Sequence, residues 1–429
     1  MQIPGRHSDT RLWHPFAAMG EVRSHEFVVT RAQDVWVWDA DGRRYLDATA
    51  SLWYANIGHG RREVIDAIAD QFRQLDAYST FGDFANRPAL DLARRLAELA
   101  PVADARIFLG SGGGDGIETA AKLALAYWGR MGEPERVHLI SRTGGYHGTH
   151  GFGTSIGGIP ANRLGRGPLI DHSSAVRHDS LEALEGELER LGERKAAAFF
   201  VEPVIGAGGV YPPPAGYLEG VEELCRKTRT LLVVDAVICA FGRLGTWFGI
   251  ERWGVEPDMI VFAKGVTSGY MPLGGVIASG RVAEPFWSSG SPPFRHGPTY
   301  AGHPAACAAA LRNLLVLEEE GLLVRGRELE VELLTALSPL SDHALVSEVR
   351  GGIGLLAAVE LEAGLLQRRP QAAAEVFRLV RDKGVLVRPL GSCLAFSPPL
   401  TATPEHFALL SETLGAALDE LQEADPGSP

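Results

Sequence analysis

The central part of the chain, residues 106–260, alternates short apolar segments with longer stretches of helical pattern. Each apolar segment has the length and composition of a strand that is buried on both faces. Because parallel strands need a crossover connection, the alternation predicts a largely parallel sheet with helices on both sides. The segments are RIFLG, VHLI, AAFFVE, LLVVD and MIVFA.

Ligands of such open sheets bind outside the carboxyl ends of the strands. Glu202, Asp235 and Lys264 each stand at the end of a predicted strand. Burial penalises a charged lysine, so Lys264 needs an explanation. Either its side chain extends from the strand end to the surface, or its amine is kept neutral and nucleophilic for a Schiff base.

Three further signals lie at strand ends. The stretch RIFLGSGGGDGIETAAKLALAYW reads as a strand, a glycine run and a helix, either a tight connection or a phosphate cradle at a helix N-terminus. Asp235 ends LLVVD, where its carboxylate needs a cationic partner, either a salt bridge or a protonated pyridine nitrogen. Tyr146 and His147 stand among glycines, as turn residues or as a stacking surface for a flat ring.

Composition narrows the class of protein. The chain has 45% hydrophobic and 22% charged residues and a net charge of −12, which argues against nucleic acid or an anionic membrane as partner. No apolar run reaches the length of a membrane span, and residues 1–16 lack the apolar core of a signal peptide. Four scattered cysteines and no clustered histidines predict a cytoplasmic protein without a metal site.

A phosphate cradle, a carboxylate, an aromatic ring and a lysine are together what pyridoxal 5′-phosphate requires. The sequence resembles the class III, or omega, aminotransferases of fold type I over residues 12–400. The likeness is greatest to the amine– and amino acid–pyruvate transaminases, and diaminopelargonate aminotransferases are also close. The motifs, in family order, are LWYANIGHG, GGYHGTHG, VEPVIGAGGVYPPPAGYL, VVDAVICAFGRLGTWFG, PDMIVFAKGVTSGYMPLGG and HGPTYAGHPAACAAAL.

The resemblance implies an α/β fold with a mostly parallel mixed sheet between helices. Residues 60–320 would form the large cofactor-binding domain. Residues 1–59 and 321–429 would together form a smaller α/β domain. The family's active sites lie at the interface of a homodimer, so a homodimer is expected here.

The resemblance also implies roles for residues of the cofactor site. Lys264 would form the Schiff base and move the proton, and Asp235 would pair with the pyridine nitrogen. The remaining cofactor-binding positions are Gly113 and Gly114 at the phosphate, Tyr146 and Val237 on the ring faces, His147 in the same loop, and Thr299 from the neighbouring subunit.

The resemblance implies roles for residues of the substrate pocket as well. Arg388 matches the family's mobile arginine for a substrate carboxylate, although a salt bridge at a strand end would also explain it. Trp53 and Tyr54 would line the substrate pocket, although a buried tryptophan is equally typical of a core. Glu202 would lie behind the cofactor rather than take part in the chemistry.

Two positions depart from the family pattern. The usual D-E-V is here Asp235-Ala236-Val237, which lacks the glutamate. The S-G-S-E of the phosphate turn is here GGGD at residues 112–115, which lacks the serine hydroxyls. Loss of one hydroxyl predicts cofactor binding weaker by about 1 kcal/mol if nothing replaces it.

The sequence therefore predicts a pyridoxal-phosphate aminotransferase that moves an amino group from an amine or amino acid to a keto acid, aldehyde or ketone by a ping-pong mechanism. An aminomutase or decarboxylase of the same fold is the first alternative. A homologue that has lost catalysis and serves as a binding scaffold is the second.

Overall fold

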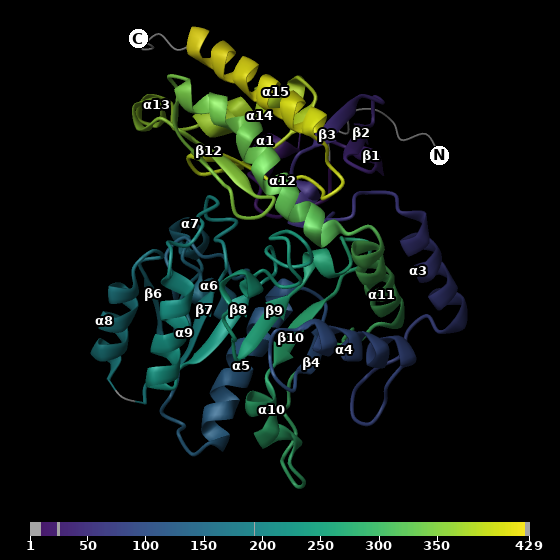
Figure 1. The fold of residues 1–429 in the computed structure, drawn as a ribbon, viewed down its shortest axis with the longest axis vertical. Helices are drawn as coiled ribbons and strands as arrows, with labels where there is room; N and C mark the ends of the chain where they lie inside the picture. The colour runs from purple at the N-terminus through teal and green to yellow at the C-terminus, as the bar shows by residue number, and fades with distance from the viewer. Residues whose placement is uncertain (1–9, 24–25, 193, 425–429) are drawn as a thin grey trace.

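A computed structural model describes residues 10–23, 26–192 and 194–424. Its centre is a seven-stranded sheet of order β4-β10-β9-β8-β7-β5-β6 (Figure 1). Strands β5 to β9 run parallel, whereas β10 is antiparallel to both of its neighbours, so the predicted mostly parallel mixed sheet is confirmed. The strands are β4 (Arg106–Gly110), β5 (His138–Arg142), β6 (Ser173–Val176), β7 (Ala196–Val201), β8 (Leu231–Asp235), β9 (Met259–Phe262) and β10 (Gly274–Ala278).

Helices cover both faces of this sheet, so its central strands are buried on both sides. Successive residues point to opposite faces: Phe200 and Val261 pack in the cluster with α5, whereas Phe199 and Ile260 pack in the larger cluster. The helices around the sheet are α3 (Arg62–Gln74), α4 (Arg87–Leu99), α5 (Gly113–Arg130), α6 (Gly151–Ile156), α7 (Pro160–Arg163), α8 (Leu181–Leu191), α9 (Tyr217–Thr228), α10 (Gly280–Trp287) and α11 (Pro304–Glu319).

Elements from the two ends of the chain lie together above the central sheet (Figure 1). Residues 35–47 alternate apolar and polar residues around Asp41-Gly42, which predicts a hairpin, and the structure confirms it. Its second strand pairs in parallel with residues 385–386 of the C-terminal part. The strands of the two small sheets are β1 (Val29–Gln33), β2 (Trp36–Asp39), β3 (Arg44–Asp47) and β13 (Val385–Leu386), then β11 (Val346–Arg350), β12 (Ala357–Leu361), β15 (Cys393–Phe396) and β14 (Arg388–Leu390).

The helical pattern of the sequence runs from residue 303 to about 337 and predicts one continuous helix there. That prediction is wrong, because Gly321 adopts a left-handed conformation (φ 62°) between α11, beside the central sheet, and α12 of the upper part. The helices of the upper part are α1 (Met19–Val22), α2 (Ala50–Trp53), α12 (Leu322–Leu337), α13 (Ala363–Arg368), α14 (Ala372–Asp382) and α15 (Pro404–Glu423). The chain division at residues 60 and 321 stays a prediction.

A fully buried arginine joins the central part to both terminal parts. Arg243 donates to the carbonyl oxygens of Leu355 (3.1 Å) and Pro398 (2.6 Å), and to Asn56 Oδ1 (2.9 Å). Burial lowers the pKa of Arg243 to about 9, which shows how strongly desolvation opposes its charge. These hydrogen bonds offset that cost and connect residues from three distant segments.

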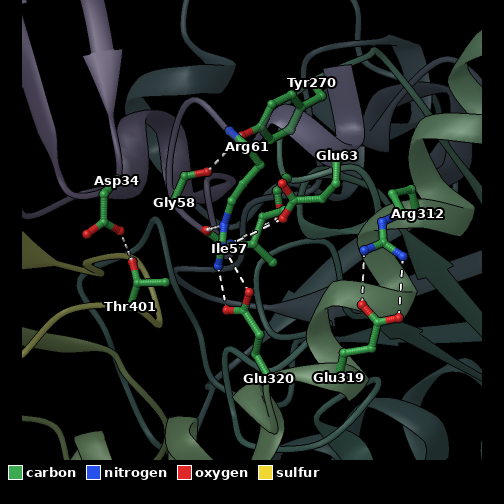
Figure 2. Close-up of polar contacts among 11 residues, drawn as sticks. Asp34, Ile57, Gly58, Arg61, Glu63, Tyr270, Arg312, Glu319, Glu320 and Thr401 are labelled. Carbon is green, nitrogen blue, oxygen red and sulfur yellow. Dashed lines mark hydrogen bonds and ion pairs between the residues drawn. The ribbon is translucent and has the colours of Figure 1, made fainter. Parts of the chain in front are cut away.

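A second joint lies at the start of α3 (Figure 2). The two terminal nitrogens of the Arg61 guanidinium donate to the carboxylate of Glu320, at 2.8 and 2.6 Å. The backbone N–H of Arg61 donates to the hydroxyl of Tyr270 (2.6 Å), which in turn donates to the carbonyl oxygen of Gly58 (3.1 Å). Because Tyr270 follows Lys264 closely in the chain, this joint fixes the segment around residue 58 against the lysine loop.

We expect Arg243→Met to lower the free energy of unfolding by roughly 3–5 kcal/mol, because it leaves three buried acceptors without a donor. Urea unfolding at fixed protein concentration measures the change. Arg226→Met is the matched control, because that exposed arginine makes a surface pair with Glu222. A loss for Arg243→Met no larger than the control's would contradict the role of Arg243 as a joint.

Candidate active site

Three parallel strands end side by side and bring the predicted acidic and basic residues to one edge of the sheet. Asp235 pairs with Val261 in the neighbouring strand β9, and Val201 of β7 pairs with Val234 of β8. Glu202 follows directly after β7, and Lys264 follows two residues after the end of β9. The sheet therefore gathers at one place three residues whose successive separations in the chain are 33 and 29 positions.

The backbone at Lys264 is held in an unusual conformation. Lys264 has a φ of 49°, in the left-handed region that few non-glycine residues adopt. The buried amide of Asn313 donates to the carbonyl oxygens of Gly265 (2.9 Å) and Val266 (3.0 Å), directly after the lysine. Such a conformation persists only where its surroundings enforce it, and Asn313 supplies that constraint.

The side chain of Lys264 is only partly accessible. Burial lowers the pKa of Lys264 to about 8, although the charges of Asp235 and Glu202 oppose this shift and that of Arg388 adds to it. A substantial fraction of the amine is therefore neutral near physiological pH. Of the two sequence interpretations, the enclosed amine agrees with a nucleophile and not with a lysine that extends to the surface.

Asp235 is 4% exposed and has two well-placed donors. Its Oδ1 accepts from the backbone N–H of Val237 (3.1 Å), and its Oδ2 lies 2.8 Å from Nδ1 of His147. Within the described chain, the ion pair with His147 is the one recorded for this carboxylate. No arginine or lysine salt bridge among these residues therefore accounts for the buried acid.

His147 lies beneath Asp235. It is 2% exposed, its ring packs 6.1 Å from that of Phe200, and its Nε2 has no hydrogen-bond partner among the residues described. The sequence predicted His147 in the cofactor loop but missed this contact with Asp235, 88 positions along the chain. A single sequence gives no signal for a pair so far apart.

Tyr146 and Arg388 face the same space from different parts of the chain. The backbone N–H of Tyr146 donates to Glu202 Oε1 (2.9 Å), which fixes the loop from behind. Burial raises the pKa of the Tyr146 hydroxyl, and the charge of Arg388 opposes that rise. Burial also raises the pKa of Glu202, which accepts a second hydrogen bond from the N–H of Gly206 (3.0 Å).

Arg388 has no counter-ion within the described parts of the chain. It is half-buried in β14, its Nε makes no hydrogen bond there, and burial lowers its pKa. A salt bridge at the strand end, the alternative reading of this arginine, is not present among these residues. The guanidinium is thus available to a carboxylate.

The glycine run forms the N-terminus of α5. Gly112 caps the helix without a side-chain hydrogen bond, so the first backbone N–H groups remain free for an anion. A Cβ on Gly113 would lie 3.0 Å from Cγ2 of Val237, which places Val237 against this turn. The predicted phosphate turn and the predicted ring-face residue are therefore in contact.

The two predicted pocket residues differ in exposure. Trp53 is 2% exposed and packs in an apolar cluster that includes Ile238 and Leu356, whereas Tyr54 is partly exposed and lies against Gly269. Thr299 is exposed, in the loop before α11. The roles of Trp53, Tyr54 and Thr299 stay predictions.

A buried carboxylate that the sequence did not single out holds the segment of Trp53 and Tyr54. Asp47 accepts from the N–H of Ser51 (2.7 Å) and from both donors of Thr49, and lies 2.9 Å from Nε2 of His59. Ser51 and Trp53 have positive φ values of 58° and 66°. Asp47 therefore stabilises a strained stretch at the edge of the site.

The residues present fit pyridoxal phosphate. Free N–H groups at α5 suit a phosphate, Asp235 suits a pyridine N–H, and Lys264 suits an aldehyde.

Among the described residues, no group of three or more histidines, cysteines and acids could hold a metal ion. A search of the same residues for a helix that could cross a membrane finds none.

Comparison with known proteins agrees with this arrangement. Residues 17–418 match the family model for class-III aminotransferases. The chain is 35% identical to a putrescine–pyruvate aminotransferase of Pseudomonas aeruginosa, over 92% of this chain and 91% of the relative. It is 36% identical to an omega-aminotransferase of Caulobacter vibrioides, over 95% and 97%.

A solved structure of an amine transaminase from an uncultivated Pseudomonas species, in its pyridoxal-phosphate-bound form, superposes with a TM-score of 0.92. The two chains are 37% identical, and the match covers 97% of this chain and all of the other. The family model and these relatives all extend over nearly the whole chain. The protein belongs to the class III aminotransferases, which use pyridoxal phosphate.

Proposed function

We propose that this pyridoxal-phosphate-dependent transaminase uses Lys264 as its covalent anchor and proton carrier in a ping-pong exchange. The amino group passes from an amine or amino acid to a keto acid, aldehyde or ketone. The observation that carries this assignment is the enclosed amine of Lys264, beside Asp235 at the edge of the central sheet. The comparisons do not favour an aminomutase, a decarboxylase or a scaffold without catalysis.

Each part of the site has a defined task. The bound cofactor supplies an aldehyde that condenses with amines and a ring that accepts electrons from the adjacent carbon. Asp235 would hold the pyridine N–H, and His147 would keep that carboxylate oriented. The neutral amine of Lys264 would remove the proton from the substrate carbon that bears nitrogen. Val237 and Tyr146 would lie on the two faces of the ring.

Arg388 is assigned to the carboxylate of the substrate. Its free guanidinium can bind a carboxylate through two parallel hydrogen bonds. The relative named for putrescine and pyruvate combines a diamine donor with a keto acid acceptor. We infer a similar pairing here, with pyruvate or a related keto acid held by Arg388, and with Trp53 and Tyr54 beside the amine.

We further propose a homodimer in the cytoplasm, with Thr299 reaching the partner's phosphate site. An open apolar cleft of about 780 Å³ lies between residues 80–93 and 293–301. Phe81, Phe84 and Tyr300 in or beside these segments are more than half exposed, which suits burial against a second copy. The four cysteines are all free and buried, as expected of a reducing compartment.

Lys264→Ala should lower the rate of transamination by roughly 10²–10⁴-fold or more, because no other described base is placed to move the proton. Borohydride reduction of the wild-type holoenzyme should attach a pyridoxyl group to Lys264, detected by peptide mass spectrometry. Lys383→Ala, at a surface ion pair with Glu420, is the control and should keep full activity. Labelling of a different lysine would reject the assignment.

Arg388→Leu should raise KM for keto acid and amino acid substrates by roughly 10²-fold, the worth of a bidentate charged hydrogen bond. Turnover of an aromatic monoamine, followed with a carbonyl acceptor that has no carboxylate, should change only a few-fold. Steady-state kinetics on both substrate pairs give the comparison. An equal loss on both pairs would show that Arg388 acts by structure alone.

Capture of the cofactor by apoenzyme should depend on pH through the amine of Lys264. Because the pKa of Lys264 is lowered to about 8, the capture rate should rise with pH and level off above about 8. The positive charge of Arg388 contributes to that low pKa, so Arg388→Leu should move the midpoint to higher pH. Stopped-flow absorbance measures the rate, and a wild-type midpoint near 10 would contradict the prediction.

A further inference from the structure

The phosphate turn of this chain carries no side chain of its own. Residues 112–114 are all glycine, and the first N–H groups of α5 have no cap from a side chain. Backbone donors alone would therefore hold an anion at this turn. A neighbouring side chain can supply a further donor only if it approaches the turn closely.

His150 makes that approach. A Cβ on Gly114 would lie 3.1 Å from Cε1, 3.2 Å from Nε2 and 3.3 Å from Nδ1 of His150. A side chain at position 114 would therefore press on the imidazole, which would have to shift by a few tenths of an ångström to admit it. Both ring nitrogens are on the side that faces the turn.

The backbone fixes His150 at this position. Gly148 has a φ of 86°, and a Cβ there would lie 3.3 Å from the Cα of Gly114, so the loop packs directly on the turn. His150 is the N-cap residue of α6, and the N–H of Phe152 in that helix donates to Oε1 of Glu118 on α5 (2.6 Å). The loop is thus packed on the turn and hydrogen-bonded to the helix that begins there.

The imidazole makes no hydrogen bond within the described chain, although it lies near one carboxylate. No hydrogen bond is recorded for either ring nitrogen, and its side chain is 53% exposed. Its Nδ1 lies 3.9 Å from Oδ1 of Asp115, which is a long ion pair when the imidazole is protonated and is beyond hydrogen-bond distance. The other oxygen of Asp115 accepts from the N–H of Ser111 (3.0 Å).

We propose that His150 binds the cofactor phosphate and replaces the hydroxyl that a serine at position 114 would supply. An imidazole N–H donates to a phosphate oxygen as a charge-assisted hydrogen bond. The inference rests on the proposed role of the Gly113–Gly114 turn as phosphate site. It adds a binding residue that belongs to this chain's own loop sequence.

Cofactor affinity of the apoenzyme tests the proposal without using activity. His150→Ala should weaken binding of pyridoxal 5′-phosphate roughly ten- to hundredfold and leave binding of pyridoxal, which has no phosphate, unchanged. Quenching of tryptophan fluorescence measures both ligands. The control His172→Asn removes an exposed imidazole at the opposite edge of the sheet and should change neither affinity. An unchanged affinity of His150→Ala for pyridoxal 5′-phosphate, or an equal loss of affinity for both ligands, would overturn the proposal.

A double substitution tests the replacement directly. Gly114→Ser alone should fail to improve binding, because the serine meets the His150 ring. In the His150→Ala background the same change should restore affinity by roughly tenfold. Equal effects of Gly114→Ser in both backgrounds would show that the two side chains do not share one place.

Borohydride labelling separates this inference from the proposed function. At saturating cofactor, all of these variants should carry the pyridoxyl group on Lys264. If the wild type lacks the label, the proposed function fails. If the label is present and His150→Ala binds the phosphate ligand like wild type, only the role of His150 fails.

Discussion

Desolvation of one amine is the constraint on which the site depends. An isolated lysine at the end of β9 would favour the surface, and the fold prevents this by enclosing Lys264 and fixing its backbone through Asn313. Enclosure lowers the pKa of the amine, and Asp235 and Glu202 limit that decrease. The amine is therefore partly neutral, so that it can act as a nucleophile, and the nearby carboxylates stabilise its charged form.

The parallel sheet makes this balance possible because its strand ends lie at one edge. The same edge exposes the N-terminus of α5, whose free N–H groups attract an anion while the buried acids repel one. Each acid is held by its own donor: Asp235 lies 2.8 Å from Nδ1 of His147, and Glu202 accepts from the backbone N–H of Tyr146.

The strands that are apolar throughout could be predicted from the sequence, because a strand that is buried on both faces is a continuous hydrophobic run. Strand β10 was not anticipated, since it begins at Gly274 and Gly275 and its antiparallel direction depends on its neighbours. The lysine and the acid could be located from strand ends. The His147–Asp235 contact and the Asp47 network could not, because each joins side chains whose proximity only the fold determines.

The two departures from the family pattern have different physical meanings. Ala236 is fully buried in the main apolar cluster, and its N–H donates to the carbonyl oxygen of Val261 (2.9 Å). A glutamate at that position would need a buried partner, and alanine needs none. At Gly114 a Cβ would lie 3.1 to 3.3 Å from the His150 ring, so a side chain there would press on the imidazole. The first departure therefore concerns packing, whereas in our proposal the second exchanges a serine hydroxyl for an imidazole and bears on cofactor affinity.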